Sequence, residues 1–159
     1  MATWRVLCAM KSLRVVDVEV KFTSARPTHR IKFGGVIMDH ATLAQVKVIV
    51  EDGGGRRTCG LGAIFLADFW AFPDAALAHE QRDLAMRRLV ERIAEGLRQV
   101  RGWDHPVALF NELDDCLGLW ADQVAAELFP GRAIPRLAQL VCASPFDAAR
   151  REPTSSRTT

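Results

Sequence analysis

Residues 46–73, VKVIVEDGGGRRTCGLGAIFLADFWAFP, hold two strand-like segments on either side of a glycine-rich reversal. Residues 44–51 are rich in Val and Ile, which favour extended backbone in a half-buried sheet. The DGGG at 52–55 supplies residues that tolerate the positive φ angles of a tight turn. Residues 56–62 then return as a second strand, so the stretch predicts an antiparallel hairpin.

A further strand is predicted upstream, over residues 14–22. Its apolar side chains alternate with charged ones, and this period of two indicates a strand with one face in water. The apolar positions are Val16, Val18, Val20 and Phe22. Residues 23–40, which contain Pro27 and two glycines, are predicted as a loop that leads to the hairpin. Three strands joined in this order predict an antiparallel β-meander.

The second half of the chain changes to helical spacing. Apolar residues recur every three or four positions in four segments, the period of an amphipathic helix. These segments are residues 75–101, 107–117, 120–128 and 134–149. A bundle of about four α-helices is therefore predicted to follow the strands. Strands first and helices afterwards indicate an α+β fold, because a parallel sheet would alternate the two.

The composition is typical of one soluble globular domain. The chain has 159 residues, of which 49% are hydrophobic and 25% charged. The formal net charge is +2, and the arginines of residues 82–98 are interleaved with Glu and Asp, as on a solvated helix face. Nucleic-acid binding is therefore not predicted. Membrane insertion is not predicted either, since no run approaches the ~20 apolar residues of a membrane span.

Four cysteines without C-x-x-C spacing predict free thiols in a reducing, cytoplasmic compartment. They are Cys8, Cys59, Cys116 and Cys142. The N-terminal MATWRVLCAMKS lacks the apolar run of a secretory signal. Residues 1–12 are expected to form a disordered leader, and both Met1 and Met10 stay open as the start.

Motifs with chemistry of their own are scarce. The GGG at 53–55 lacks the spacing and the lysine of a phosphate-binding loop, so a hairpin turn is the better interpretation. The histidines do not show the paired spacing of metal ligands. They are His29, His40, His79 and His105. On the residues alone, the sequence predicts no catalytic residue, metal site or cofactor site in this chain.

Three segments carry a resemblance to a known family. They are VVDVEV at 15–20, the stretch at 46–73 and IPRLAQLVCASPFDAA at 134–149. In this order they resemble the N-terminal capping domain of the enolase superfamily, in its branch of mandelate racemase and muconate-lactonizing enzymes. The resemblance covers residues 13–149 and rests on the order of elements, since no single motif is as specific as a metal-binding signature.

The resemblance implies an isomerase or lyase built from two parts. In that family an α+β cap precedes a (β/α) barrel, which binds Mg²⁺ and holds the acid–base residues. The reaction removes a proton α to a carboxylate, and the metal stabilises the enediolate that forms. Racemisation, epimerisation, cycloisomerisation and dehydration all stay open. Mg²⁺ is expected only in a full-length relative, because the family's metal-binding carboxylates and its Lys-x-Lys motif match nothing here.

The family's cap contributes two loops that close over the barrel mouth, exclude water and shape substrate choice. These loops match residues 26–40 and 63–72. The side chains in them that are expected to face substrate or barrel are Ile31, Phe33, Val36, Phe65, Phe69, Trp70 and Phe72. Packing in the cap's own core is the alternative for each of them. Many relatives carry Glu where this chain has Ala63, which leaves the reaction subgroup open.

The ending RREPTSSRTT at 150–159 is polar and shows no periodicity. It is expected to be a disordered tail, and the break in pattern suggests a truncation or frameshift near Arg150. Because a barrel needs ~200 residues, the chain alone is expected to be inactive. An uncovered barrel-facing surface would also favour self-association.

The expected partner is a catalytic barrel, either the protein's own C-terminal domain or a separate chain. Two alternatives stay open. One is a stand-alone α+β binding module that pairs with a separate barrel or with another protein. The other is an unrelated α+β interaction protein, since three strands followed by helices form a common grouping.

Overall fold

The computed structural model describes residues 12–26, 28–29, 31–33, 36–38, 40–100, 102 and 106–151. Most of the predicted leader, residues 1–11, and residues 152–159 of the predicted tail lie outside this set. Residue 12 is described with the domain, and α4 continues through residues 150 and 151, so helical structure extends past the boundary expected at residue 149.

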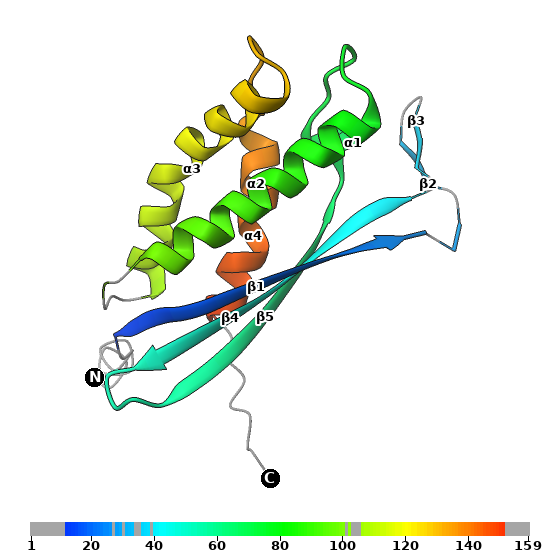
Figure 1. Cartoon of the computed structure of the whole chain (residues 1–159). Coiled ribbons are helices and arrows are strands. Elements are labelled where there is room, and N and C mark those ends of the chain that lie inside the picture. The colour runs from blue at the N-terminus through cyan, green and yellow to red at the C-terminus, as the bar shows by residue number, and fades with distance from the viewer. Residues whose placement is uncertain are drawn as a thin grey trace, which may run out of the picture.

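A three-stranded antiparallel sheet forms one layer of the molecule (Figure 1). Its strands are β1 (Leu13–Ala25), β4 (Ala41–Asp52) and β5 (Arg57–Leu66), in the order β1-β4-β5. The predicted meander is therefore confirmed. The loop prediction for residues 23–40 is wrong in part, because β1 runs on to Ala25. Within the same segment β2 (Ile31–Phe33) pairs with β3 (Val36–Met38) as a separate antiparallel hairpin.

A β-bulge changes which side chains of β1 face the core. The register with β4 jumps from Val15 to Asp17, so Val16 is the extra residue. Val15 is consequently buried together with Val18, whereas Val16 is half-buried. The predicted alternation from Val16 onward is correct only after the bulge, because a one-residue insertion moves the preceding side chains to the other face.

In the part of the chain that the structure describes, four helices follow the sheet, as predicted: α1 (Asp68–Ala71), α2 (His79–Gln99), α3 (Pro106–Leu128) and α4 (Arg136–Arg151). Their division along the chain differs from the prediction. The segments 107–117 and 120–128 form one continuous helix, α3, because Gly118 is accommodated inside it. A glycine within a helix costs only about 1 kcal/mol, less than the packing of the two apolar stripes supplies. α1 lies in a segment predicted as a loop.

A turn delays the start of α2 from the predicted residue 75 to His79. The Oδ1 atom of Asp74 accepts a hydrogen bond from the Ala76 backbone N–H at 2.9 Å. This bond, followed by an ion pair with Arg132, holds the pKa of the Asp74 carboxyl below its usual range. The Gln81 side chain accepts the Ala78 N–H at 2.9 Å, which satisfies an otherwise free donor before the helix.

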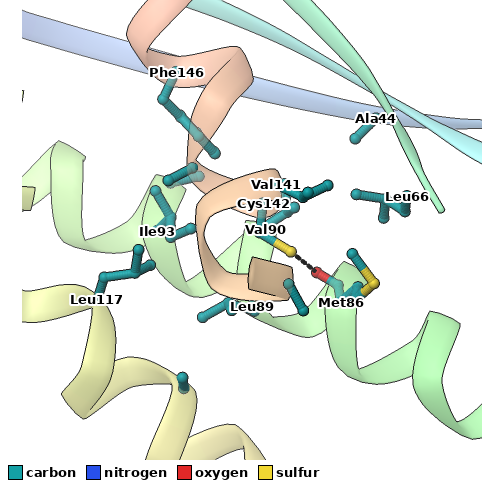
Figure 2. Close-up of a cluster of buried hydrophobic side chains, with 14 of the residues drawn as sticks. Ala44, Leu66, Met86, Leu89, Val90, Ile93, Leu117, Val141, Cys142 and Phe146 are labelled. Atoms are coloured by element: carbon teal, nitrogen blue, oxygen red, sulfur yellow. Dashed lines mark hydrogen bonds between the residues drawn. The ribbon is translucent and has the colours of Figure 1, made fainter. Parts of the chain in front are cut away.

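The helices cover one face of the sheet (Figure 1). α2 packs on β1 and α4 packs on β5 and β4, while α3 packs mainly against α2 and α4. Figure 2 shows the core between these helices, where the Cys142 thiol donates to the Met86 carbonyl at 3.5 Å. Burial raises the pKa of the Cys142 thiol, so it stays protonated. The described cysteines, Cys59, Cys116 and Cys142, form no disulfide with one another; Cys8 lies outside the described residues.

Two glycines allow the backbones of α4 and β5 to touch. A Cβ atom at Gly60 would lie 1.5 Å from the Ala149 carbonyl oxygen, and one at Gly62 would lie 1.9 Å from the Pro145 carbonyl oxygen. Any other residue at these positions would therefore push the helix off the sheet. The Gly-Leu-Gly of β5 thus has a packing role in this fold.

The helix α4 also contains a proline at its contact with the sheet. Pro145 has no N–H, so the Val141 carbonyl loses its helical donor. The Ser144 hydroxyl donates to that carbonyl at 3.0 Å and replaces the missing bond. In the described part of the chain, no helix combines the length and apolar character that crossing a bilayer requires.

Candidate functional site

The two segments expected to form capping loops leave the sheet at the same end. Ala25 pairs with Ala41, and Thr42 pairs with Leu66, so β1 ends where β4 begins and β5 ends. The β2–β3 hairpin and α1 follow from this end, away from the 52–57 turn (Figure 1). We call this region the loop end of the sheet: residues 40–42, 66–72 and the start of α2.

The aromatic residues expected to face substrate or barrel divide into different environments. Phe65 is 51% exposed on the sheet face that carries no helix, and Trp70 in α1 is 39% exposed. Phe69 is half-buried. Phe72 fits the alternative of packing in the core, because it is 1% exposed and packs edge-to-face on Phe129 with ring centroids 6.0 Å apart. It belongs to the core.

The remaining three expected residues lie in the hairpin. Ile31 and Phe33 belong to β2, and Val36 belongs to β3, where it pairs with Phe33. The side chains of these three residues lie outside the described set. Their backbone register places Phe33 and Val36 opposite each other next to the hairpin turn.

A polar cluster at the loop end was missed by the sequence analysis. Asp68, the first residue of α1, is 2% exposed and lies between two cationic or potentially cationic groups. Its Oδ1 atom is 3.0 Å from His79 Nδ1, and its Oδ2 atom accepts from Arg82 Nε at 2.9 Å. Arg82 also donates to the carbonyls of Asp74 and Leu77. The carboxylate thus joins α1 to the start of α2.

The cluster extends to the start of β4 through a second histidine. His40 Nε2 lies 2.9 Å from His79 Nε2, and the two rings meet edge to face with centroids 4.7 Å apart. His40 is exposed, and His79 is half-buried. We call His40, His79, Asp68 and Arg82 the junction. It ties together three segments that are distant in sequence.

A local signal could have pointed to part of the junction. Asp68 interrupts the apolar run LADFWAF, and an acid in such a run is either exposed or paired. The histidines gave no signal, because positions 40 and 79 approach each other only through the fold.

The junction does not form a metal site. Among the residues that the structure describes, no group of three or more His, Cys, Asp or Glu side chains could hold a metal ion. The junction contributes two imidazole nitrogens that already contact each other, and a carboxylate engaged by Arg82. Its chemistry is that of a hydrogen-bonded clasp between segments.

The helix-free face of the sheet carries a shallow groove of about 360 Å³. It is lined by Glu19, Lys21, Gln45, Lys47, Leu61 and Ala63, among others. Lys47 Nζ donates to the Glu19 carboxylate at 3.0 Å, and this bond raises the pKa of the lysine. Leu61 beside this pair is 67% exposed. The face is therefore polar along β1 and apolar along β5.

Comparisons with known proteins find similar solved structures, among them the following two. No family model and no curated protein matches the chain. An enolase from Bradyrhizobium, solved in complex with magnesium and mandelic acid, is 16% identical with a TM-score of 0.48; the match covers 87% of this chain and 30% of that one. An enolase superfamily member from Roseovarius nubinhibens ISM is 15% identical with a TM-score of 0.36, over 82% of this chain and 29% of that one.

Both neighbours carry the name of the superfamily that the sequence resembles. The chain spans about 30% of the length of each. Any statement about function therefore rests on the arrangement of this chain's own strands and helices.

Proposed function

We propose that this chain is the N-terminal capping domain of an enzyme of the mandelate racemase and muconate-lactonizing type. In this role the domain closes the mouth of a (β/α) barrel, excludes water and shapes the pocket. The barrel, supplied by the protein's own C-terminal part or by a separate chain, abstracts a proton α to a carboxylate with the help of Mg²⁺.

The observation that carries this proposal is the convergence at the loop end. A cap must present two separate segments to one mouth, and here residues 26–40 and 63–72 leave the same end of the sheet. His79 clasps His40 on one side and Asp68 on the other, so the two segments are held in one arrangement. Trp70 and Phe65 supply exposed aromatic surface at this end, the type of surface that lines ligand pockets.

Within such an enzyme, this chain shapes the substrate pocket and excludes water from it, and the residues that transfer protons belong to the barrel. The described residues hold no cluster of metal-binding carboxylates. The mandelic acid of the Bradyrhizobium structure suggests a small α-hydroxy carboxylate or a related acid as the substrate class. Ala63 leaves the subgroup open among racemases, epimerases, cycloisomerases and dehydratases.

The helix-free sheet face favours a second candidate function. Leu61 and Phe65 form exposed apolar surface along β5, beside the Lys47–Glu19 pair. Exposed apolar area next to charged groups is typical of a protein interaction surface. The second candidate is therefore a stand-alone module that binds another protein through this face.

Reading the coding DNA separates the two candidates. The region runs from the codon of Ser144 through several hundred bases beyond the codon of Thr159. A cap joined to its own barrel predicts that one of the three frames encodes a barrel with a Lys-x-Lys motif and three spaced carboxylates. Absence of such a barrel from every frame would contradict a cap joined to its own barrel and favour the stand-alone module.

A further inference from the structure

The junction has a fixed direction of hydrogen bonding at neutral and higher pH. Asp68 is held as an acceptor by Arg82, whose Nε donates to Oδ2 at 2.9 Å. The other carboxylate oxygen therefore accepts from His79, so the proton of a neutral His79 lies on Nδ1. The Nε2 atom of His79 then carries a lone pair.

This lone pair determines which ring nitrogen of a neutral His40 carries the proton. Because His79 Nε2 is an acceptor, the bond of 2.9 Å between the two Nε2 atoms requires His40 to donate its Nε2 proton. The chain of donors runs from His40 to His79 to Asp68. Each imidazole uses one proton, and the contact is satisfied while both rings are neutral.

One added proton leaves the contact intact, but two do not. With one extra proton, His79 carries N–H on both nitrogens, and its Nε2–H can donate to a His40 ring whose proton has moved to Nδ1. With two extra protons, both Nε2 atoms carry hydrogen and face each other at 2.9 Å. Neither can accept, and two like charges meet at the start of β4.

We propose that His40 and His79 form a pH-dependent clasp that joins the start of β4 to α1 and α2 and opens when both imidazoles are protonated. Histidine gains its proton within the range of about pH 8 to 5, so the clasp responds to mild acidification. The inference concerns the chain itself, and it does not depend on the proposed capping function.

Charged groups from α1, α2 and the turn before α2 lie in or near the junction. The Asp68 carboxylate from α1 faces His79 Nδ1 at 3.0 Å. The Arg82 guanidinium from α2 is paired with the same carboxylate. The Asp74 carboxylate in the preceding turn is engaged by Arg132.

Linkage fixes the sign of the effect. The closed clasp takes up the second proton less readily than the open arrangement, in which the rings are apart. The closed form is therefore stable at the higher pH and is lost as the pH falls. Opening exposes the first residues of β4, which pair with the last residues of β1 and β5.

Amide hydrogen exchange at pH 8 and pH 5, corrected for the intrinsic exchange rate, tests the clasp on the purified chain. In the wild type we expect the protection of the amides of residues 41–44 against exchange to fall about fivefold at the lower pH. A factor of this size corresponds to the loss of one hydrogen bond. Residues 46–50 in the middle of β4 serve as the internal reference. Imidazole nitrogen NMR at pH 8 should find the Nδ1–H form of His79.

Three variants make the test specific. His40→Ala removes the clasp and should show low protection at both pH values, without further loss at pH 5. His40→Gln keeps an N–H donor that cannot gain a proton, so its protection should depend less on pH than that of the wild type. His29→Ala removes an exposed imidazole outside the junction and should behave as the wild type.

Two results would overturn the proposal. One is equal protection of residues 41–44 in the wild type at both pH values. The other is a loss of protection of residues 41–44 at pH 5 in His40→Ala or His40→Gln that is as large as the loss in the wild type. Since the experiment contains no barrel and no substrate, its outcome is independent of the capping function.

Discussion

Two of the contacts between the helices and the strand layer differ in how they are built. α4 meets β5 through bare backbone, where Gly60 and Gly62 leave no room for a side chain. At the loop end, His79 and Asp68 bridge their segments through polar side chains, and His40 is exposed to water. The first contact has no titratable group and leaves no room for a side chain at either glycine. By our proposal the second opens when both imidazoles are protonated, so an adjustable contact and a fixed contact lie in separate parts of one small domain.

The largest expected effect comes from breaking the backbone contact. Gly60→Ala places a Cβ atom 1.5 Å from the Ala149 carbonyl oxygen, so α4 must move away from the sheet. We expect a loss of about 3 kcal/mol in the free energy of unfolding, or failure to fold. Urea denaturation measures it. Gly53→Ala is the matched control, because its Cβ would meet nothing within 4 Å. A stable Gly60→Ala protein would contradict the packing described for α4.

Removing the carboxylate of the junction should have the next largest effect. Asp68→Ala leaves Arg82, with 15% of its side chain exposed, without its paired charge. It also removes the acceptor for His79. We expect a loss of about 2–3 kcal/mol by urea denaturation. Glu95→Ala, which breaks an exposed pair with Arg92 on α2, should cost less than about 0.5 kcal/mol. Equal losses in both variants would mean that the junction does not stabilise the fold.

A smaller effect is expected at the proline of α4. Ser144→Ala removes the hydroxyl that donates to the Val141 carbonyl, which Pro145 leaves without its helical donor. We expect a loss of about 1 kcal/mol in thermal or urea unfolding. Ser24→Ala, at an exposed position of β1, is the control and should be neutral. A neutral result for Ser144→Ala would show that another donor serves the Val141 carbonyl.

The smallest effect concerns the sheet end opposite the loop end. A hydrogen bond from Arg57, followed by one from Arg14, holds the pKa of the Glu51 carboxyl below its usual range. A depressed pKa adds stability above the unfolded-state pKa, and that stability is lost as the pH falls through the folded-state pKa. The free energy of unfolding of Glu51→Gln, measured by urea denaturation, should therefore fall less between pH 7 and pH 3 than that of the wild type. Glu91→Gln, from an exposed pair, should show the same fall as the wild type.

Much of the fold could be predicted because periodicity reports burial directly. The three strands of the sheet and the apolar stripes of the helices follow from the spacing of Val, Ile and Leu. The bulge at Val16 could not be predicted, because an extra residue leaves the local pattern intact and only shifts its phase. The hairpin of β2 and β3 was also missed, since strands of three residues are too short for a period to appear.

The candidate site was less accessible to prediction. The loop segments were placed by resemblance, and the aromatic residues in them were chosen by type. Phe72 shows the weakness of that choice, because its burial against Phe129 depends on where α3 ends. The junction required knowledge of the register of β4 and the entry of α2, which bring His40 and His79 together over 39 positions of sequence.

Binding of the chain to a catalytic barrel would show whether the loop end is a capping surface. A barrel from the protein's own coding DNA or from a separate chain would be produced, purified and mixed with this chain, and amide hydrogen exchange would map the contact. We expect the barrel to slow amide hydrogen exchange in residues 40–44 and 63–72 and to leave exchange in the 52–57 turn at the opposite end unchanged. Slower exchange in that turn instead, or no change anywhere, would contradict the assignment of the loop end as the capping surface.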